Sequence, residues 1–138
     1  MAIVIFLILT VFFWGMAPIF DKIGLRGTDV LPALTFRSIV VTLFLLLATL
    51  VCKKADALFN MDMKSALALS LSAIFAGLLG MLTYYSALRL GATSRIVPLA
   101  ATYPLVTAFL SIIILREGVS IYRVIGIVLI VGGIWLVK

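Results

Sequence analysis

The sequence predicts an all-α integral membrane protein with five transmembrane helices. Apolar residues make up 65% of the 138 residues, far above the roughly 45–50% of a soluble domain, and the mean hydropathy is +1.36. Runs such as Ile112–Leu115 and Val128–Val131 do not alternate apolar and polar residues, as barrel strands must. Because a backbone in lipid has to satisfy its hydrogen bonds internally, helices are the structure that fits.

Five apolar runs are each about as long as the ~20 residues with which a helix crosses a bilayer. They give the expected spans 2–20, 31–52, 65–88, 96–115 and 121–137. No linker or low-complexity tract separates them, so we expect one transmembrane domain over residues 1–138. An odd number of spans places the two ends of that domain on opposite sides of the membrane.

The first three spans are separated by polar connections. The first span carries no charge, and Pro18 near its end is expected to kink the helix, because proline removes an amide donor and crowds the preceding turn. The second span begins beside Pro32, a residue favoured early in a helix, and its one charge is Arg37. The third span, 65–88, is uncharged throughout.

The last two spans differ in their special residues. Pro98 and Pro104 lie in the span 96–115, and each frees a carbonyl one turn earlier. Freed backbone at membrane depth is tolerated where it is buried or lines a cavity, which favours a helix on a transport pathway. Gly126 and Gly133 are seven residues apart and share a face of the last span, where small residues permit close helix packing. The partner helix could belong to the same chain or to a second copy.

Basic residues are distributed almost evenly over the two sides of the membrane. The net charge is +6, but one to three basic residues lie in each connection rather than on one face, so nucleic acid is not an expected partner. Arg37 apart, the side of the N-terminus receives Lys53, Lys54, Lys64, Arg116 and Arg123, and the other side receives Lys22, Arg26, Arg89, Arg95 and Lys138. Because lysine and arginine imbalance sets orientation, insertion in both orientations and a fixed orientation set by another feature both stay open.

A few polar groups lie within or beside the expected spans. Arg37 either extends to the headgroups or faces a water-filled cavity, where it would bind anions or act in gating. Asp21 and Lys22 form either an interfacial pair or a gate at a cavity mouth. Solute sites are mostly apolar with a few polar groups, so the residues that either line such a site or simply pack are Trp14, Tyr84, Thr102 and Tyr103.

The composition excludes several kinds of chemistry. Cys52 is the one cysteine and there is no histidine, so a disulfide framework, a zinc site and a histidine-based catalytic dyad are excluded within one chain. The five acidic residues all lie near interfaces and leave little for general acid–base catalysis. We therefore expect neither an enzyme nor a metal or cofactor site.

Four segments stand in a characteristic order: Trp14–Lys22, Thr35–Ser38, Tyr84–Leu88 and Ser94–Leu105, followed by Glu117 and a glycine-rich last span. This order resembles the EamA domain of the drug/metabolite transporter superfamily over essentially the whole chain. Most proteins with this pattern carry two such domains related as an inverted repeat, and this chain resembles one. The resemblance implies a secondary transporter of a small metabolite or organic solute in the cell membrane, working by alternating access as an antiparallel homodimer. The alternative is a non-catalytic subunit that assembles with another membrane protein.

The resemblance also extends the set of candidate residues. With it, the substrate-cavity candidates are Trp14, Arg37, Tyr84, Tyr85, Arg95, Thr102 and Tyr103; the gating or kink candidates are Pro18, Asp21, Lys22, Pro98 and Pro104; and the dimer-packing candidates are Gly126 and Gly133. That glycine pair is similar to the one in the last span of the four-span small multidrug resistance transporters. Their pattern places a glutamate in the first span, whereas the first twenty residues here have no acidic group.

Overall fold

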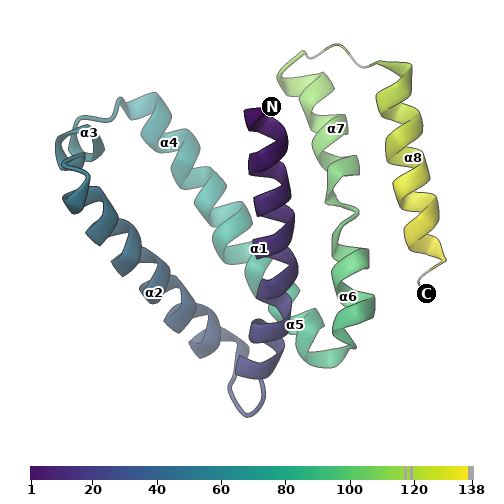
Figure 1. Ribbon diagram of the computed structural model, residues 1–138, viewed down its shortest axis with the longest axis horizontal. Helices are drawn as coiled ribbons and strands as arrows, with labels where there is room; N and C mark the ends of the chain where they lie inside the picture. The colour runs from purple at the N-terminus through teal and green to yellow at the C-terminus, as the bar shows by residue number, and fades with distance from the viewer. Residues whose placement is uncertain (117, 119, 137–138) are drawn as a thin grey trace. The chain divides into compact units, whose positions relative to one another are not determined.

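The computed structural model describes residues 1–116, 118 and 120–136, and this part of the chain is helical without strands (Figure 1). Glu117 and Lys138 lie outside the described residues, as does the expected end of the last span at residue 137. The predicted all-helical class is confirmed. The chain divides into two compact units, Met1–Arg89 and Leu90–Lys138, and each is described by itself.

The first unit contains three long helical segments. They are α1 (Ala2–Gly24), α2 (Val30–Val51) and a continuous stretch of 28 residues made of α4 (Met63–Ser72), the π-helix η1 (Ala73–Gly80) and α5 (Met81–Leu90). The short helix α3 (Ala55–Phe59) connects α2 to α4. Helix α1 does not end at Pro18 but continues to Gly24; the kink expected at Pro18 stays a prediction.

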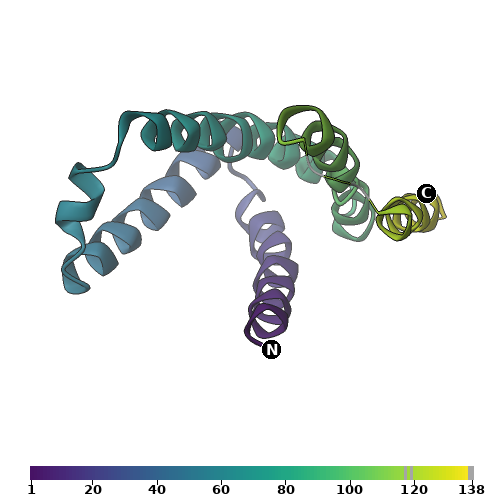
Figure 2. The ribbon, with the colours of Figure 1, turned by 90° about the horizontal axis from the view of Figure 1, so that it is seen from above.

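The three segments converge at one end and diverge toward the other. Figures 1 and 2 show α1, α2 and α5 meeting near the α1–α2 connection, while the N-terminus, α3 and the start of α4 lie apart. The buried residues of this unit follow the same pattern, since Pro18, Leu25, Leu34, Tyr85 and Leu88 all belong to the converging ends. The converging end is therefore where tertiary contacts hold the helices in place.

Local hydrogen bonds explain two of the helix ends in this unit. Lys53 has a φ of 54°, and its amide donates to the Leu50 carbonyl while the Lys54 amide donates to the Thr49 carbonyl. This is a Schellman ending, in which a residue in the left-handed region satisfies the last carbonyls of α2. At the start of α4, the Asp62 carboxylate accepts a 2.9 Å hydrogen bond from the Ser65 amide, which caps that helix and lowers the pKa of Asp62.

The π-helix η1 lies in the middle of the third expected span. A Cβ placed on Gly80 would lie 2.9 Å from the Phe75 carbonyl oxygen, whereas one on Gly77 would meet nothing within 4 Å. Gly80 thus allows the close backbone approach that the wider turn produces. π-Helical turns within α-helices are rare and are found frequently at functional sites.

The second unit consists of α6 (Thr93–Ala100), α7 (Tyr103–Ile114) and α8 (Ile121–Trp135). Pro98 lies inside α6, and the helix breaks at Ala101–Thr102 before Pro104, which occupies the first turn of α7, where proline is well tolerated. Helices α7 and α8 lie side by side (Figures 1 and 2).

Four helical stretches among the described residues are long and apolar enough to cross a membrane: Ala2–Gly24, Val30–Val51, Met63–Leu90 and Thr93–Ile114. Large apolar side chains are exposed along their length. Helix α8 is apolar but has 15 residues, so it is about 22 Å long, shorter than the ~30 Å hydrocarbon core. Four of the five expected spans thus correspond to helical stretches long enough to cross a membrane. The fifth corresponds to the shorter helix α8, and its crossing stays a prediction.

Candidate functional site

Three helices of the first unit meet at one carboxylate. The Tyr85 hydroxyl of α5 donates a 2.5 Å hydrogen bond to Asp21 Oδ1 of α1. Arg37 Nε of α2 lies 3.9 Å from the same oxygen, so the two charges form an ion pair beyond hydrogen-bond length. The Asp21 side chain is 13% exposed and that of Arg37 is 42% exposed. The acid is therefore enclosed, while much of the guanidinium stays accessible.

A second group of contacts fastens the same ends of the helices. Lys22 Nζ donates to the Leu88 carbonyl at 2.5 Å and to the Arg89 carbonyl at 3.4 Å. A cation is favourable there because the last carbonyls of a helix lack intrahelical partners and carry a partial negative charge. Arg89 Nη1 lies 3.0 Å from Asp29 Oδ1, just before the start of α2. These contacts link α1, α2 and α5 at the converging end.

A hollow of about 730 Å³ opens beside the Asp21–Arg37 pair. Its volume falls within the ~300–1,000 Å³ typical of small-molecule sites. Apolar side chains make up most of its wall, and polar groups are few. It is lined by Ala17, Phe20, Asp21, Gly24, Thr28, Pro32, Ala33, Phe36, Arg37 and Tyr85. An apolar cavity with one acid, one guanidinium and one phenol can hold an organic solute and orient it by its charged group.

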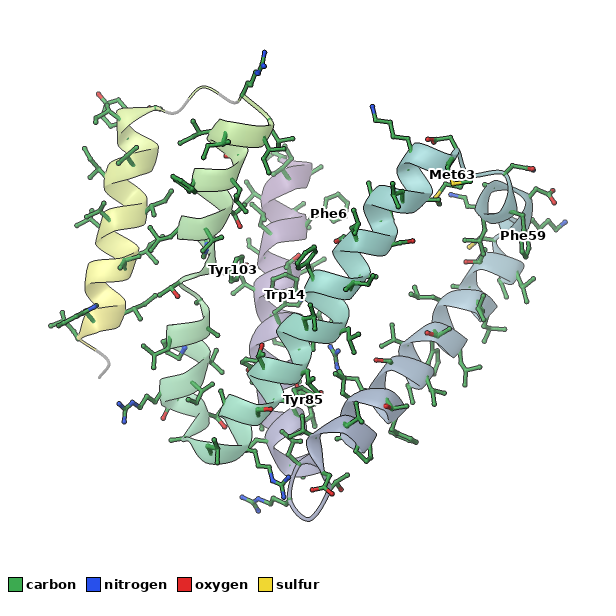
Figure 3. The ribbon with its side chains drawn as sticks, turned by 180° about the vertical axis from the view of Figure 1, so that it is seen from behind. Phe6, Trp14, Phe59, Met63, Tyr85 and Tyr103 are labelled. Carbon is green, nitrogen blue, oxygen red and sulfur yellow. The ribbon has the colours of Figure 1, made fainter. Side chains whose placement is uncertain are left out.

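The structure brings together some of the sequence candidates in this unit and leaves others apart. Asp21, Arg37 and Tyr85 line the hollow. Trp14 lies on the exposed surface of α1 (Figure 3) and does not belong to the lining. The ring of Tyr84 lies 6.3 Å from that of Tyr85, centroid to centroid, also outside the lining.

The candidates of the second unit lie around a much smaller cavity. Thr102 and Pro104 line a space of about 10 Å³ between α7 and α8, enough for about one water molecule. Tyr103 is exposed, and neither it nor Arg95 lines this space. A Cβ placed on Gly126 or Gly133 of α8 would meet nothing within 4 Å, so the described residues leave room beside both glycines.

The lining of the hollow follows the helical periodicity of the sequence. Its α1 lining has positions 17, 20, 21 and 24, and its α2 lining has positions 32, 33, 36 and 37. Residues three and four apart share one face of a helix. Each set includes one charged residue close to an end of its helix, and that combination would have selected Phe20, Pro32 and Phe36 together with Asp21 and Arg37.

The comparison with protein families identifies one family for this chain. The family model described as the EamA-like transporter family matches residues 1–138. An uncharacterized protein of Methanocaldococcus jannaschii is 33% identical over an alignment that covers 99% of this chain and 96% of that protein. No solved structure matches the chain.

Proposed function

Because the chain belongs to the EamA-like transporter family, a family of multi-pass membrane transporters of small solutes, we propose that it moves a small metabolite or organic solute across the cell membrane by alternating access. The observation that carries this proposal is the hollow of about 730 Å³ between α1 and α2, with Asp21, Arg37 and Tyr85 in its wall. It has the size and the mixed lining of a solute site.

The distribution of contacts in the first unit supports alternating access. At one end, Asp21 of α1 contacts Arg37 of α2 and Tyr85 of α5. Lys22 of α1 and Asp29, just before α2, also contact the end of α5. At the other end the helices diverge (Figure 3, where Phe59 and Met63 lie at the diverging end). A transporter must close one end of its path while the other is open. In our proposal the polar contacts form the closed gate, and they break when the solute leaves on that side.

We propose further that the transporter is an antiparallel homodimer with α8 as the fifth span. Five basic residues on each expected side of the membrane permit insertion in both orientations. The open space beside Gly126 and Gly133 leaves α8 free to pack closely against a helix of a second copy. A hydrophobic stretch shorter than the bilayer is accommodated by local thinning or by oligomerisation, which suits a 15-residue helix at an interface.

The single cysteine tests the orientation. Cys52 is exposed after the end of α2, so a membrane-impermeant maleimide applied to intact cells should label about half of the molecules if both orientations occur. Permeabilised cells give full labelling and Cys52→Ser gives none as controls. All-or-none labelling of intact cells would refute dual insertion. Efficient oxidative Cys52–Cys52 cross-linking would refute the antiparallel pair, because inversion puts the two thiols on opposite sides.

Flux measurements test transport itself. Protein reconstituted alone in liposomes should carry at least one class of labelled solute among amino acids, organic acids and organic cations, and Arg37→Gln should reduce that flux while Lys64→Gln, at the exposed start of α4, should not. Folded protein that carries no solute in liposomes would refute the proposal. Purification from cells as a stable complex with a different membrane protein would then indicate the alternative of a non-catalytic subunit.

A further inference from the structure

We propose that the hollow selects organic anions, in which a carboxylate binds the guanidinium of Arg37 and an apolar body packs on the facing sides of α1 and α2. This inference rests on the proposed transport function and assigns a substrate class to its site. The two charges that line the hollow differ in exposure, since the Arg37 side chain is 42% exposed and that of Asp21 is 13% exposed.

Arg37 has binding capacity that the protein does not use. Its ion pair with Asp21 involves Nε at 3.9 Å, and among the described contacts it makes no hydrogen bond. A guanidinium offers five N–H donors in a planar fork. The edge formed by the two terminal nitrogens therefore remains available for a carboxylate, which it can bind through two parallel hydrogen bonds. The 42% exposure of the side chain allows a solute to reach it.

Asp21 is in the opposite situation. Its side chain is 13% exposed, and Oδ1 both accepts the Tyr85 hydroxyl and faces Arg37. A cationic solute would have to displace a buried phenol or compete with a guanidinium in order to bind this carboxylate. The described contacts therefore favour an anion at Arg37 over a cation at Asp21.

Two of the nearby cations are already engaged. Lys22 donates to the carbonyls of Leu88 and Arg89, and Arg89 pairs with Asp29. Neither Lys22 nor Arg89 belongs to the lining of the hollow. Arg37 is the cation of the lining, so the anionic head of the solute has a defined place.

The rest of the wall determines the body of the solute. Ala17 and Phe20 of α1 and Pro32, Ala33 and Phe36 of α2 present apolar surface beside Arg37. Burial of apolar surface is the general driving force for binding in such a pocket. A small organic anion with an apolar or aromatic body matches this surface better than an inorganic ion, which would leave it bare.

Binding of this anion also acts on the closed end of the helices. A carboxylate at the two terminal nitrogens leaves Asp21 at Nε, but it shares the charge of the guanidinium and so weakens the Arg37–Asp21 pairing across α1 and α2, while the Tyr85 hydrogen bond to Asp21 persists. The solute thus competes with one of the contacts that hold the converging end together. Substrate binding and loosening of the gate are linked through a single side chain.

Three probes with the same ring separate the possibilities: benzoate, benzylammonium and benzyl alcohol, measured by calorimetry on purified protein and by flux in liposomes. Benzoate should bind at least about tenfold more tightly than the alcohol, as expected for charge-assisted hydrogen bonds, and benzylammonium should bind no better than the alcohol. Arg37→Gln should abolish the preference for benzoate. Arg37→Lys, which keeps the charge but loses the fork, should retain part of it.

Asp21→Asn provides the sharpest control. It removes the internal competitor, so benzoate should bind more tightly than to the unchanged protein, whereas a purely structural role for the pair predicts weaker binding in Asp21→Asn and Arg37→Gln alike. Lys64→Gln should leave binding unchanged. Preference for benzylammonium, or benzoate binding that survives Arg37→Gln, would overturn this inference and leave the transport proposal standing. Absence of flux for all solute classes would instead overturn the transport proposal.

Discussion

Removal of the Tyr85 hydroxyl is expected to destabilise the first unit by about 2 kcal/mol. Tyr85 is 3% exposed, and its hydroxyl donates a 2.5 Å hydrogen bond to a carboxylate that is itself 13% exposed. Tyr85→Phe keeps the ring and its packing and deletes this one bond. Hydrogen bonds to charged groups contribute about 1.5–3 kcal/mol, because the charged partner loses solvation that it does not regain. A loss near the middle of this range lowers the folding equilibrium constant roughly 30-fold.

Reversible unfolding in mixed micelles, followed by circular dichroism, measures this change. Tyr84→Phe is the matched control on the neighbouring residue, since the Tyr84 hydroxyl makes no hydrogen bond among the described contacts, and its effect should stay within about 0.5 kcal/mol. In an Asp21→Asn background the acceptor is neutral, so Tyr85→Phe should cost only about 0.5–1.5 kcal/mol. The difference between the two backgrounds is the coupling energy of the pair.

Two results would contradict this reasoning. Equal destabilisation by Tyr84→Phe and Tyr85→Phe would mean that the cost comes from general packing of the phenols. An unchanged cost of Tyr85→Phe in the Asp21→Asn background would mean that the hydroxyl acts through a partner other than the Asp21 carboxylate.

Three further predictions concern local structure in the first unit. Lys53→Gly should stabilise the protein by about 1 kcal/mol in chemical unfolding, since a non-glycine residue in the left-handed region costs roughly 1–2 kcal/mol. Lys54→Gly, at a φ of −106°, should not stabilise it, and equal effects of the two substitutions would be evidence against the Schellman ending. Gly80→Ala should destabilise the protein by about 1–3 kcal/mol, because the added Cβ would lie 2.9 Å from the Phe75 carbonyl oxygen. Gly77→Ala serves as the control in the same melts, since its Cβ would meet nothing within 4 Å. An unchanged stability of Gly80→Ala would refute the close approach in η1. A backbone hydrogen bond lowers the pKa of Asp62 below its usual value of 3.8, so the stability from its charged form is present above that pH and is lost as the pH falls through the lowered pKa. Melts between about pH 6 and pH 2 should show a loss that Asp62→Asn lacks, and identical pH profiles would exclude this cap.

The sequence alone identified the residues of the candidate site as candidates, and the structure showed which of them lie together. Arg37 and Tyr85 had been assigned to the substrate cavity together with Trp14 and Tyr103, whereas Asp21 had been assigned to the gate. Only the structure places Asp21, Arg37 and Tyr85 around one oxygen. The Tyr85–Asp21 and Arg37–Asp21 contacts join different helices. They depend on how the helices are packed, and a single sequence carries no direct record of that packing.

The remaining differences concern the helices of the second unit. The two prolines of the span 96–115 were expected to free backbone carbonyls, and the structure interrupts the helix at Ala101–Thr102, between α6 and α7. The five apolar runs all form helices, but α8 has only 15 residues, so its crossing of the membrane remains a prediction. The exact limits of a helix depend on its terminal hydrogen bonds, to which average hydropathy is not sensitive.

The sequence by itself determined that this chain is a helical membrane protein, because hydropathy and helix formation are local, and the order of its motif segments carried the resemblance to the EamA family. In lipid each helix satisfies its backbone within its own segment, so composition over about twenty residues is sufficient. Only the tertiary structure decided that α1, α2 and α5 converge at one end, that Asp21 is enclosed while Arg37 stays accessible, and that a hollow of solute size lies beside them. These features arise from side chains that meet across helices, and their energies depend on the burial and hydrogen-bond partners that folding creates.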